Sequence, residues 1–288
     1  MRVRGSEASS VKIVVILLGT GTPNLKDDHW GPSTLVHAGG NYFLFDCGRG
    51  TLLRIKQAGV EPEEVSKVFL THLHSDHVVG LPDLWLTGWE MGRRESLRLW
   101  GPDGTASMVS HLELTFSANV KGRQEPPQSL PSHLAGIVAS EIEEGVIYSE
   151  KGVKVTCFLV DHGSFKPAFG FRVDYDGCSV VLSGDTRFSE NLVKYSQGVG
   201  VLIHDAWVVA KDSGSVALQL VASPEEVAKV FNRVKPRLGV ISHYNTVEGL
   251  AQRIRVGYEG EFMVGRDLVR VEIGLDSVAT SRVHPIGP

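Results

Sequence analysis

Residues 71–77, with the sequence Thr-His-Leu-His-Ser-Asp-His, constrain the fold of this chain more than any other segment. Three imidazoles and one carboxylate lie within six positions, and their nitrogen and oxygen atoms suit zinc and similar divalent metals. The preceding residues 67–70 are typical of a short buried strand, and residues 78–81 are typical of the start of a helix. The sequence therefore predicts metal ligands on a strand-to-helix turn, held by a rigid scaffold.

Three further segments each place a candidate ligand after a strand-like run. Residues 153–160, 179–184 and 238–242 precede an Asp-His pair ending in His162, Asp185 and His243, respectively. Because each candidate follows the C-terminal end of a predicted strand, we expect all of them to converge on one edge of a sheet structure. A lone histidine at a strand end is as often a polar residue with no metal role. The prediction therefore depends on the whole set.

The order of these motifs resembles the metallo-β-lactamase superfamily and, within it, the ribonuclease Z-like branch. The matching segments are residues 18–23, 44–51, 71–77, 183–186, 202–206 and 242–243, together with His162. The resemblance implies an α/β fold, a four-layer αβ/βα sandwich in which two mixed β-sheets face each other with helices on the outer faces. We expect residues 1–288 to form a single domain of this kind, with a surface loop or lid near residues 119–135.

The same resemblance implies two divalent metal ions, with zinc as the first choice and manganese or iron as alternatives. The implied ligands form two groups joined by one bridging carboxylate: His72, His74 and His162 for the first ion, Asp76, His77 and His243 for the second, and Asp185 for both.

A site of this kind points to hydrolysis. Two such ions lower the pKa of a bridging water and stabilise a leaving oxygen. Their charge outweighs that of two carboxylates and one hydroxide, which favours an anionic transition state. We therefore predict a metal-dependent hydrolase in which a metal-bridging hydroxide attacks a small phosphoester, and within this class a phosphodiester. Hydrolysis of small lactones, carboxylic esters, β-lactams or aryl sulfates is the alternative reaction, and a metal-binding scaffold or sensor that has lost catalysis is the non-enzyme alternative.

The chain departs from the branch at one position that bears on catalysis. The branch usually carries a histidine before a capped helix, where it donates a proton, and this chain has Val221 in that place. Loss of a general acid costs about 10²-fold to 10⁴-fold in rate. The candidate catalytic residues are Asp76, Asp205 and His204. Asp205 takes the place of the usual acidic partner and His204 is a substitute donor, with a structural carboxylate and a supporting hydrogen bond as the respective alternatives.

Several aromatic side chains could form an apolar pocket for the substrate. Trp85 and Trp89 lie four positions apart on a predicted helix and share one face. With Trp30 and Phe165 they could line the mouth of the site, and core packing is the alternative for Trp85 and Trp89. Asp46 is expected to orient a metal-binding imidazole rather than to act on the substrate.

Composition bears on partners and compartment. The net charge is −4, and no cluster of Lys and Arg lies between His77 and His162, which argues against nucleic acid as a partner. The apolar residues 11–18 include Lys12 and are too few to cross a bilayer, so we expect no membrane association. Three cysteines cannot all pair, and this favours a cytoplasmic location. We therefore expect a small-molecule substrate and leave a homodimer open.

Overall fold

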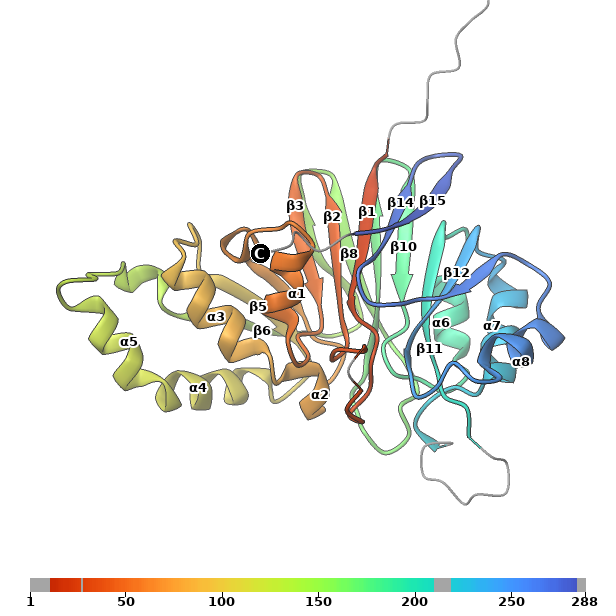
Figure 1. Cartoon of the computed structure of the whole chain (residues 1–288), viewed down its shortest axis with the longest axis horizontal. Helices are drawn as coiled ribbons and strands as arrows, with labels where there is room; N and C mark the ends of the chain where they lie inside the picture. Colours follow the sequence, from red (N-terminus) through yellow and green to blue (C-terminus); the bar gives the residue numbers. More distant parts are fainter. Residues whose placement is uncertain (1–10, 27, 210–218, 284–288) are drawn as a thin grey trace, which may run out of the picture.

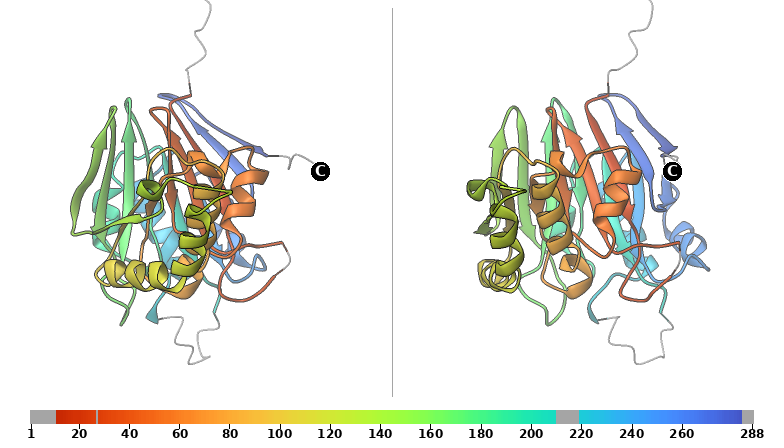
Figure 2. Two further views of the ribbon diagram at one scale, coloured as in Figure 1. Left: turned by 90° about the vertical axis from the view of Figure 1, so that its left-hand side faces the viewer. Right: turned by 60° about the vertical axis from the view of Figure 1, so that its left-hand side comes forward.

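The computed structural model describes residues 11–26, 28–209 and 219–283. Within these residues an eight-stranded and a seven-stranded sheet face each other, with helices on their outer faces (Figures 1 and 2). Both sheets contain parallel and antiparallel pairs. The predicted four-layer sandwich of two mixed sheets is confirmed.

The first sheet contains strands from both the early and the late part of the sequence. Its strands in spatial order are β15 (Val278–Arg282), β14 (Val269–Ile273), β1 (Ile13–Gly19), β2 (Ser33–Ala38), β3 (Asn41–Phe45), β4 (Lys67–Phe69), β5 (Leu97–Gly101) and β6 (Ile137–Glu141). β1 is buried along its whole length because both of its faces are covered.

The second sheet carries the three candidate ligands that lie late in the sequence. Its strands in spatial order are β13 (Phe262–Val264), β12 (Leu238–Tyr244), β11 (Val201–Ala206), β10 (Cys178–Leu182), β9 (Phe169–Tyr175), β8 (Val153–Leu159) and β7 (Gly145–Glu150). The hairpin between β9 and β10 turns at Asp176 and Gly177, which have φ angles of 47° and 77°. Positive φ at both central positions is the geometry that an Asp-Gly pair favours in a two-residue hairpin.

Apolar side chains fill the space between the sheets and the space under each helical layer. Side chains of a strand alternate between its two faces, so Val15 and Leu17 of β1 pack between the sheets, whereas Val14 and Ile16 pack under the helices. This packing holds the strand ends in fixed positions.

The helices divide between the two outer faces. Those that follow strands of the first sheet are α1 (Thr51–Gln57), α2 (Ser75–Val78), α3 (Leu81–Glu90), α4 (Thr105–Thr115) and α5 (Ser117–Gln124), with 3₁₀ turns η1 (Pro62–Glu64) and η2 (Ser132–Leu134). Those on the second sheet are α6 (Glu190–Tyr195), α7 (Pro224–Val234) and α8 (Leu250–Gly257). Among the helices that the structure describes, none has the length and apolar character needed to cross a membrane.

The segment expected to be a loop or lid begins later than predicted. Residues 119–124 belong to α5, which has no buried residues and lies with α4 at the left of Figure 1, beyond α3. The irregular stretch therefore starts at Glu125, where two prolines follow and prevent the helix from continuing.

Candidate metal centre

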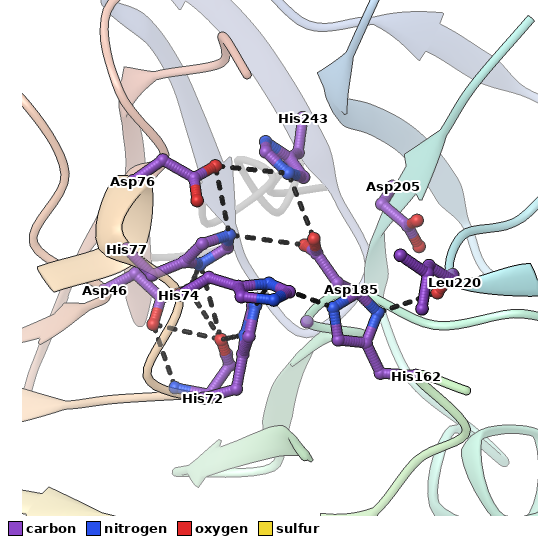
Figure 3. A network of polar contacts seen from close by, with 12 residues as sticks. Asp46, His72, His74, Asp76, His77, His162, Asp185, Asp205, Leu220 and His243 are labelled. Carbon is purple, nitrogen blue, oxygen red and sulfur yellow. Dashed lines mark hydrogen bonds and ion pairs between the residues drawn. The ribbon is translucent and has the colours of Figure 1, made fainter. Parts of the chain in front are cut away.

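All seven predicted ligands lie at one end of the two sheets and point toward one another (Figure 3). Residues 72–77 follow β4 and enter α2, His162 follows β8, Asp185 follows β10, and His243 lies near the end of β12. The first sheet thus contributes four of these side chains and the second sheet three. The structure brings together every ligand that the sequence predicted.

The first group consists of three imidazoles whose ring nitrogens converge. Nδ1 of His74 lies 2.8 Å from Nε2 of His72 and 3.2 Å from Nε2 of His162. Nitrogen ligands at about 2.0–2.1 Å in a tetrahedral site lie about 3.3 Å from one another. The three nitrogens are therefore spaced as ligands of a single ion.

The second group combines a carboxylate with two imidazoles. Nε2 of His77 lies 3.6 Å from Oδ2 of Asp76, and Nε2 of His243 lies 3.9 Å from the same oxygen. Asp185 stands beside this group, with Oδ1 3.6 Å from His77 Nε2 and Oδ2 3.1 Å from His243 Nε2. Its carboxylate also lies within ligand distance of His72. Asp185 therefore occupies the place between the two groups that a bridging ligand needs.

Each of four imidazoles is held through its second ring nitrogen. The partners are Thr71 Oγ1 for His72 (2.9 Å), Asp46 Oδ2 for His77 (2.8 Å), the Leu220 carbonyl for His162 (2.7 Å) and the Gly21 carbonyl for His243 (2.7 Å). Such contacts fix the tautomer and the orientation of a metal-binding imidazole. The two carbonyl partners were missed by the sequence analysis, because a backbone group leaves no residue-type signal.

Asp46 has the supporting role that the sequence predicted. Besides His77, it accepts hydrogen bonds from the backbone amide and the hydroxyl of Thr71, at 2.8 and 2.9 Å. Thr71 in turn contacts His72, so one carboxylate supports a histidine in each group.

Cys47, which follows Asp46, is fully buried in an apolar cluster, and burial raises the pKa of its thiol far above the usual value. Cys47 is not placed as a ligand.

A glycine beside this turn allows the ligand segment to pack closely. A Cβ atom on Gly48 would lie 2.5 Å from the carbonyl oxygen of Asp76 and 2.6 Å from Gly31. Such distances are too short for non-bonded contact, so a larger residue at this position would push the Asp76 turn away from the other ligands.

The two groups have different electrostatics. Burial lowers the pKa of both His72 and His74, which favours the neutral imidazole that binds metal. Burial also lowers the pKa of His77, but the carboxylates of Asp185 and Asp46 outweigh it, and the pKa lies well above the usual value. Burial raises the pKa of Asp185, and the neighbouring His243 and His77 more than reverse that effect. Imidazolium–carboxylate pairs therefore hold the second group together when no ion is bound.

The structure separates the roles of Asp205 and His204. The ring of His204 has no exposed surface and faces Phe231 of α7, on the helical side of the second sheet. Its Nδ1 donates to the backbone carbonyl of Asp205 at 2.8 Å and lies 3.0 Å from Oδ1 of the same residue. His204 is therefore placed to support Asp205, and its ring does not face the ligands.

Asp205 faces the space between the sheets. It lines a cavity of about 50 Å³ together with Asp185, His77 and His243. Although apolar side chains also line this cavity, its carboxylates and imidazoles can hold a water molecule in a space of this volume. Burial raises the pKa of Asp205, although His204 opposes this effect.

Trp85 and Trp89, for which the sequence left the mouth of the site and the core as alternatives, lie in the core. Trp85 and Trp89 are 1% exposed, and their indole N–H groups donate to the carbonyls of Ala135 and Pro131, at 2.8 and 3.1 Å. Of the two alternatives for these tryptophans, the structure shows core packing. Periodicity showed correctly that they share a face of α3, but it could not show that residues 131–135 cover that face.

Other aromatic rings do border the ligands. The ring of Phe165 lies 3.9 Å from that of His74, centroid to centroid, and is only partly buried. On the side of the second group, Trp207 lies 6.2 Å from His243. Trp207 was missed, although it directly follows β11. Trp30 packs against Gly50 and Arg54.

Comparisons with known proteins agree with the fold and the site. Residues 13–247 match the family described as Anti-Pycsar protein Apyc1. The chain is 36% identical over 279 residues to ribonuclease Z from Mycobacterium sp. strain KMS, which covers 91% of this chain and 96% of that protein. Two solved structures share the fold. They are the metallo-β-lactamase fold protein YhfI from Bacillus subtilis (TM-score 0.73, 15% identity, 94% of this chain and 100% of that one) and the short form of human tRNase Z (0.69, 21%, 92% and 100%).

These relatives contradict one expectation. The net charge and the lack of a Lys and Arg cluster between His77 and His162 favoured a partner other than nucleic acid, yet a protein that matches over most of the chain is named ribonuclease Z. The physical reason is that net charge describes the whole molecule, whereas RNA can be bound through a few local contacts and the metal centre itself.

The predicted enzyme class is confirmed by the same relatives, whose family implies divalent metal ions, and the converging imidazoles and carboxylates have the donor atoms that such ions bind. The chain therefore belongs to the ribonuclease Z-like branch of the metallo-β-lactamase superfamily, within the family described as Anti-Pycsar protein Apyc1, and is a metal-dependent hydrolase of phosphoesters.

Proposed function

We propose that this protein is a dinuclear zinc phosphodiesterase and that it accepts small phosphodiesters. One observation carries the proposal: seven ligand-type side chains from four segments of the chain meet in two groups, with Asp185 between them.

The ligand set supports both the number and the kind of ions. The first group offers three nitrogens and the second offers two nitrogens and a carboxylate oxygen, which is a usual donor set for zinc. When bound, two such ions would lower the pKa of a water between them and stabilise negative charge on the leaving oxygen. No thiolate lies among these ligands, as would be common in a closed structural site.

The residues of the chain prepare this reaction in distinct ways. Asp46 and the carbonyls of Gly21 and Leu220 keep the imidazoles in the orientation needed to hold the ions. Asp205 supplies a proton to the leaving group, through water in the cavity that it shares with Asp185. The raised pKa of this buried carboxyl supports that role, because a carboxyl must be protonated to donate.

The proton donor can be tested separately from the metal centre. Asp205→Asn should slow a diester with a poor leaving group, such as dimethyl phosphate, by about 10²-fold. The same variant should slow a 4-nitrophenyl diester much less, since that leaving group departs without a proton. Equal losses on the two substrates would contradict the assignment.

Phe165 supports the choice of a small substrate with a planar group. Its partly exposed ring lies against His74 and extends the apolar surface at the first group. A planar ring of a substrate can stack on such a side chain while its phosphodiester reaches the ions. Phe165→Ala should therefore raise KM for a ring-bearing diester more than for dimethyl phosphate.

A second candidate substrate is the phosphodiester of an RNA chain. It is favoured by the relative named ribonuclease Z, which covers 91% of this chain. The chemical group attacked is the same, so the two candidates differ in what lies on either side of the phosphorus.

The test is a metal analysis combined with a substrate panel. We expect two zinc ions per chain by elemental analysis. The loaded protein should hydrolyse bis(4-nitrophenyl) phosphate in preference to 4-nitrophenyl acetate, a simple lactone and 4-nitrophenyl sulfate. An RNA with a 3′ extension completes the panel and separates the second candidate from the first.

Two variants control for contaminants and for general damage. His74→Ala removes a first-group ligand and should abolish hydrolysis, whereas His111→Ala removes an exposed imidazole of α4 and should not. A diester rate no higher in the wild type than in His74→Ala would refute the proposal.

A further inference from the structure

We propose that Asp267 is a positioning residue for the second metal ion. It lies in the connection between β13 and β14, beyond the residues 13–247 that match the family. The inference rests on the two-ion centre of the proposed function and concerns how one half of that centre is held in place.

Asp267 is a buried carboxylate whose two oxygens both have two partners. Oδ1 accepts hydrogen bonds from the backbone amide and the hydroxyl of Thr20, at 2.9 and 2.8 Å. Oδ2 accepts from the backbone amide of Trp30 and from the guanidinium of Arg54, at 2.9 and 2.8 Å. The residue is 4% exposed. Because charge-assisted hydrogen bonds are stronger than neutral ones, this carboxylate fixes the groups around it firmly.

Through these bonds Asp267 closes the loop between β1 and β2. Thr20 and Trp30 lie at the two ends of that loop, and one carboxylate holds both amides. Between them, the amide of Gly21 donates to the carbonyl of Trp30 at 2.8 Å. A Cβ atom on Gly21 would lie 2.8 Å from the carbonyl oxygens of His29 and Trp30, so the packed backbone leaves no room for a side chain at this position.

The closed loop presents the carbonyl that orients a ligand. Gly21 O accepts the Nδ1–H of His243 at 2.7 Å, which turns Nε2 toward Asp185 and Asp76. His243 itself has a φ of 50°, a left-handed conformation that is uncommon for residues other than glycine. The backbone of Tyr244 adds to this restraint, since its amide donates to the Thr20 carbonyl.

The first group of ligands does not share this support. His72 is held by Thr71 and His162 by the Leu220 carbonyl. A change at Asp267 should therefore affect the two ions unequally. A residue that served stability alone would not discriminate between them.

The experiment measures the affinity of each zinc equivalent by competition with a chromophoric chelator. In Asp267→Asn, which keeps the shape of the side chain, we expect the second-group ion to bind about 10-fold more weakly, at the lower end of the range for groups that support ligands directly. The first-group ion should keep its affinity within about twofold by the same reasoning. His243→Ala, which lacks a second-group ligand, identifies the binding step that belongs to that group.

Glu95→Gln is the matched control for loss of a charge-assisted contact. Glu95 accepts a hydrogen bond from the buried Lys67 at 2.8 Å, at the end of β4 away from His72. This variant should keep both affinities. Thr20→Val, which removes one of the four bonds to Asp267, should give a smaller loss at the same ion and secures the test if Asp267→Asn folds poorly.

Three results would overturn the inference. The first is a wild-type affinity for both ions in Asp267→Asn. The second is an equal loss of both ions, which would indicate general unfolding. The third is binding of fewer than two ions by the wild type, and this result would contradict the proposed two-ion function as well.

Discussion

The two groups of candidate ligands are held by the chain in different ways. In the first group, His72 and His74 come from a single turn, and His74 is only partly buried beside Phe165. In the second group, His77 and His243 have side-chain exposures of 2% and 7% and depend on Asp46, on the Gly21 carbonyl and through it on Asp267. Each group contains two buried ligands and one partly buried ligand, His74 in the first and Asp76 in the second. The two halves of the site therefore differ in the contacts that support their buried imidazoles, and not in how deeply they are buried.

Asp185 is the side chain whose loss should affect both halves, and it gives the largest expected effect. Asp185→Ala removes the carboxylate that lies near His72, His77 and His243. We expect the loss of at least one ion and a fall in diester hydrolysis of at least about 10³-fold, since bound ions stabilise developing charge by several kcal/mol. Elemental analysis and initial rates measure this. Asp161→Ala, which removes an acidic residue beside His162, is the control and should keep both ions.

Substitution of Asp46 tests whether the two groups of ligands are supported unequally, because it should weaken the binding of one ion more than that of the other. Asp46→Asn weakens the contact to His77 Nδ1 directly and reaches His72 only through Thr71. The second ion should bind about 10-fold to 100-fold more weakly, the range for loss of a group that orients a ligand. Chelator competition measures both affinities. Losses of equal size for the two ions would remove the distinction between a direct and an indirect contact.

The metal-free protein should show opposite pH trends for the two halves. The raised pKa of His77 means that its pairing with Asp185 and Asp46 stabilises the fold fully below about pH 6.5, the unfolded value, and less as pH rises through the folded value. The lowered pKa of His72 has the reverse effect, since protonating this buried ring costs stability as pH falls below the same value.

Chemical denaturation of metal-free protein between pH 5 and pH 9 measures these trends. Relative to the wild type, His77→Gln should lose less stability on the alkaline side, and His72→Gln should lose less on the acidic side. The same slope in both variants would show that the two halves do not differ in their charge pairing.

The substitution with the smallest expected effect is Glu95→Gln, which lies far from both groups of ligands. Glu95→Gln removes the partner of Lys67, and because Glu95 is half exposed the loss should be less than about 1 kcal/mol. Although burial opposes it, contact with Lys67 and Ser66 lowers the pKa of Glu95, so its contribution is present above its unfolded pKa and is lost as pH falls through the folded one. Urea denaturation at pH 7 and pH 3 measures this difference, while diester hydrolysis should stay at the wild-type rate.

Local patterns predicted that the ligands converge, whereas the architecture and the division of the ligands between two ions were predicted from the resemblance to a known family. Ligand residues follow apolar strands, and strands that pack in a layered sandwich bring their ends to one edge, so His162, Asp185 and His243 could be placed together without knowing the loops between them. Asp46 was assigned correctly for a similar reason, since it directly follows β3 beside the ligand turn.

The features that were missed depend on tertiary contacts that leave no local pattern. Asp267 is a single acidic residue in a short connection, and only the folded chain shows that it reaches Thr20 and Trp30. For Trp85 and Trp89 the sequence left the core and the mouth of the site open, because a shared helix face does not reveal what covers it. The end of α5 was predicted as a loop for two reasons. Prolines follow it, and because the helix has no buried side chains, its sequence lacks a periodic apolar pattern.

The origin of the ligands in both sheets has a consequence for assembly of the molecule. Residues 72–77 come from the first sheet, whereas His162, Asp185 and His243 come from the second. A bound ion therefore acts as a cross-link between the two layers of the sandwich, and it can be captured only after both layers have formed and docked. Zinc added during refolding should raise the yield of native protein through mass action on the docked state, with little effect on how fast either layer forms.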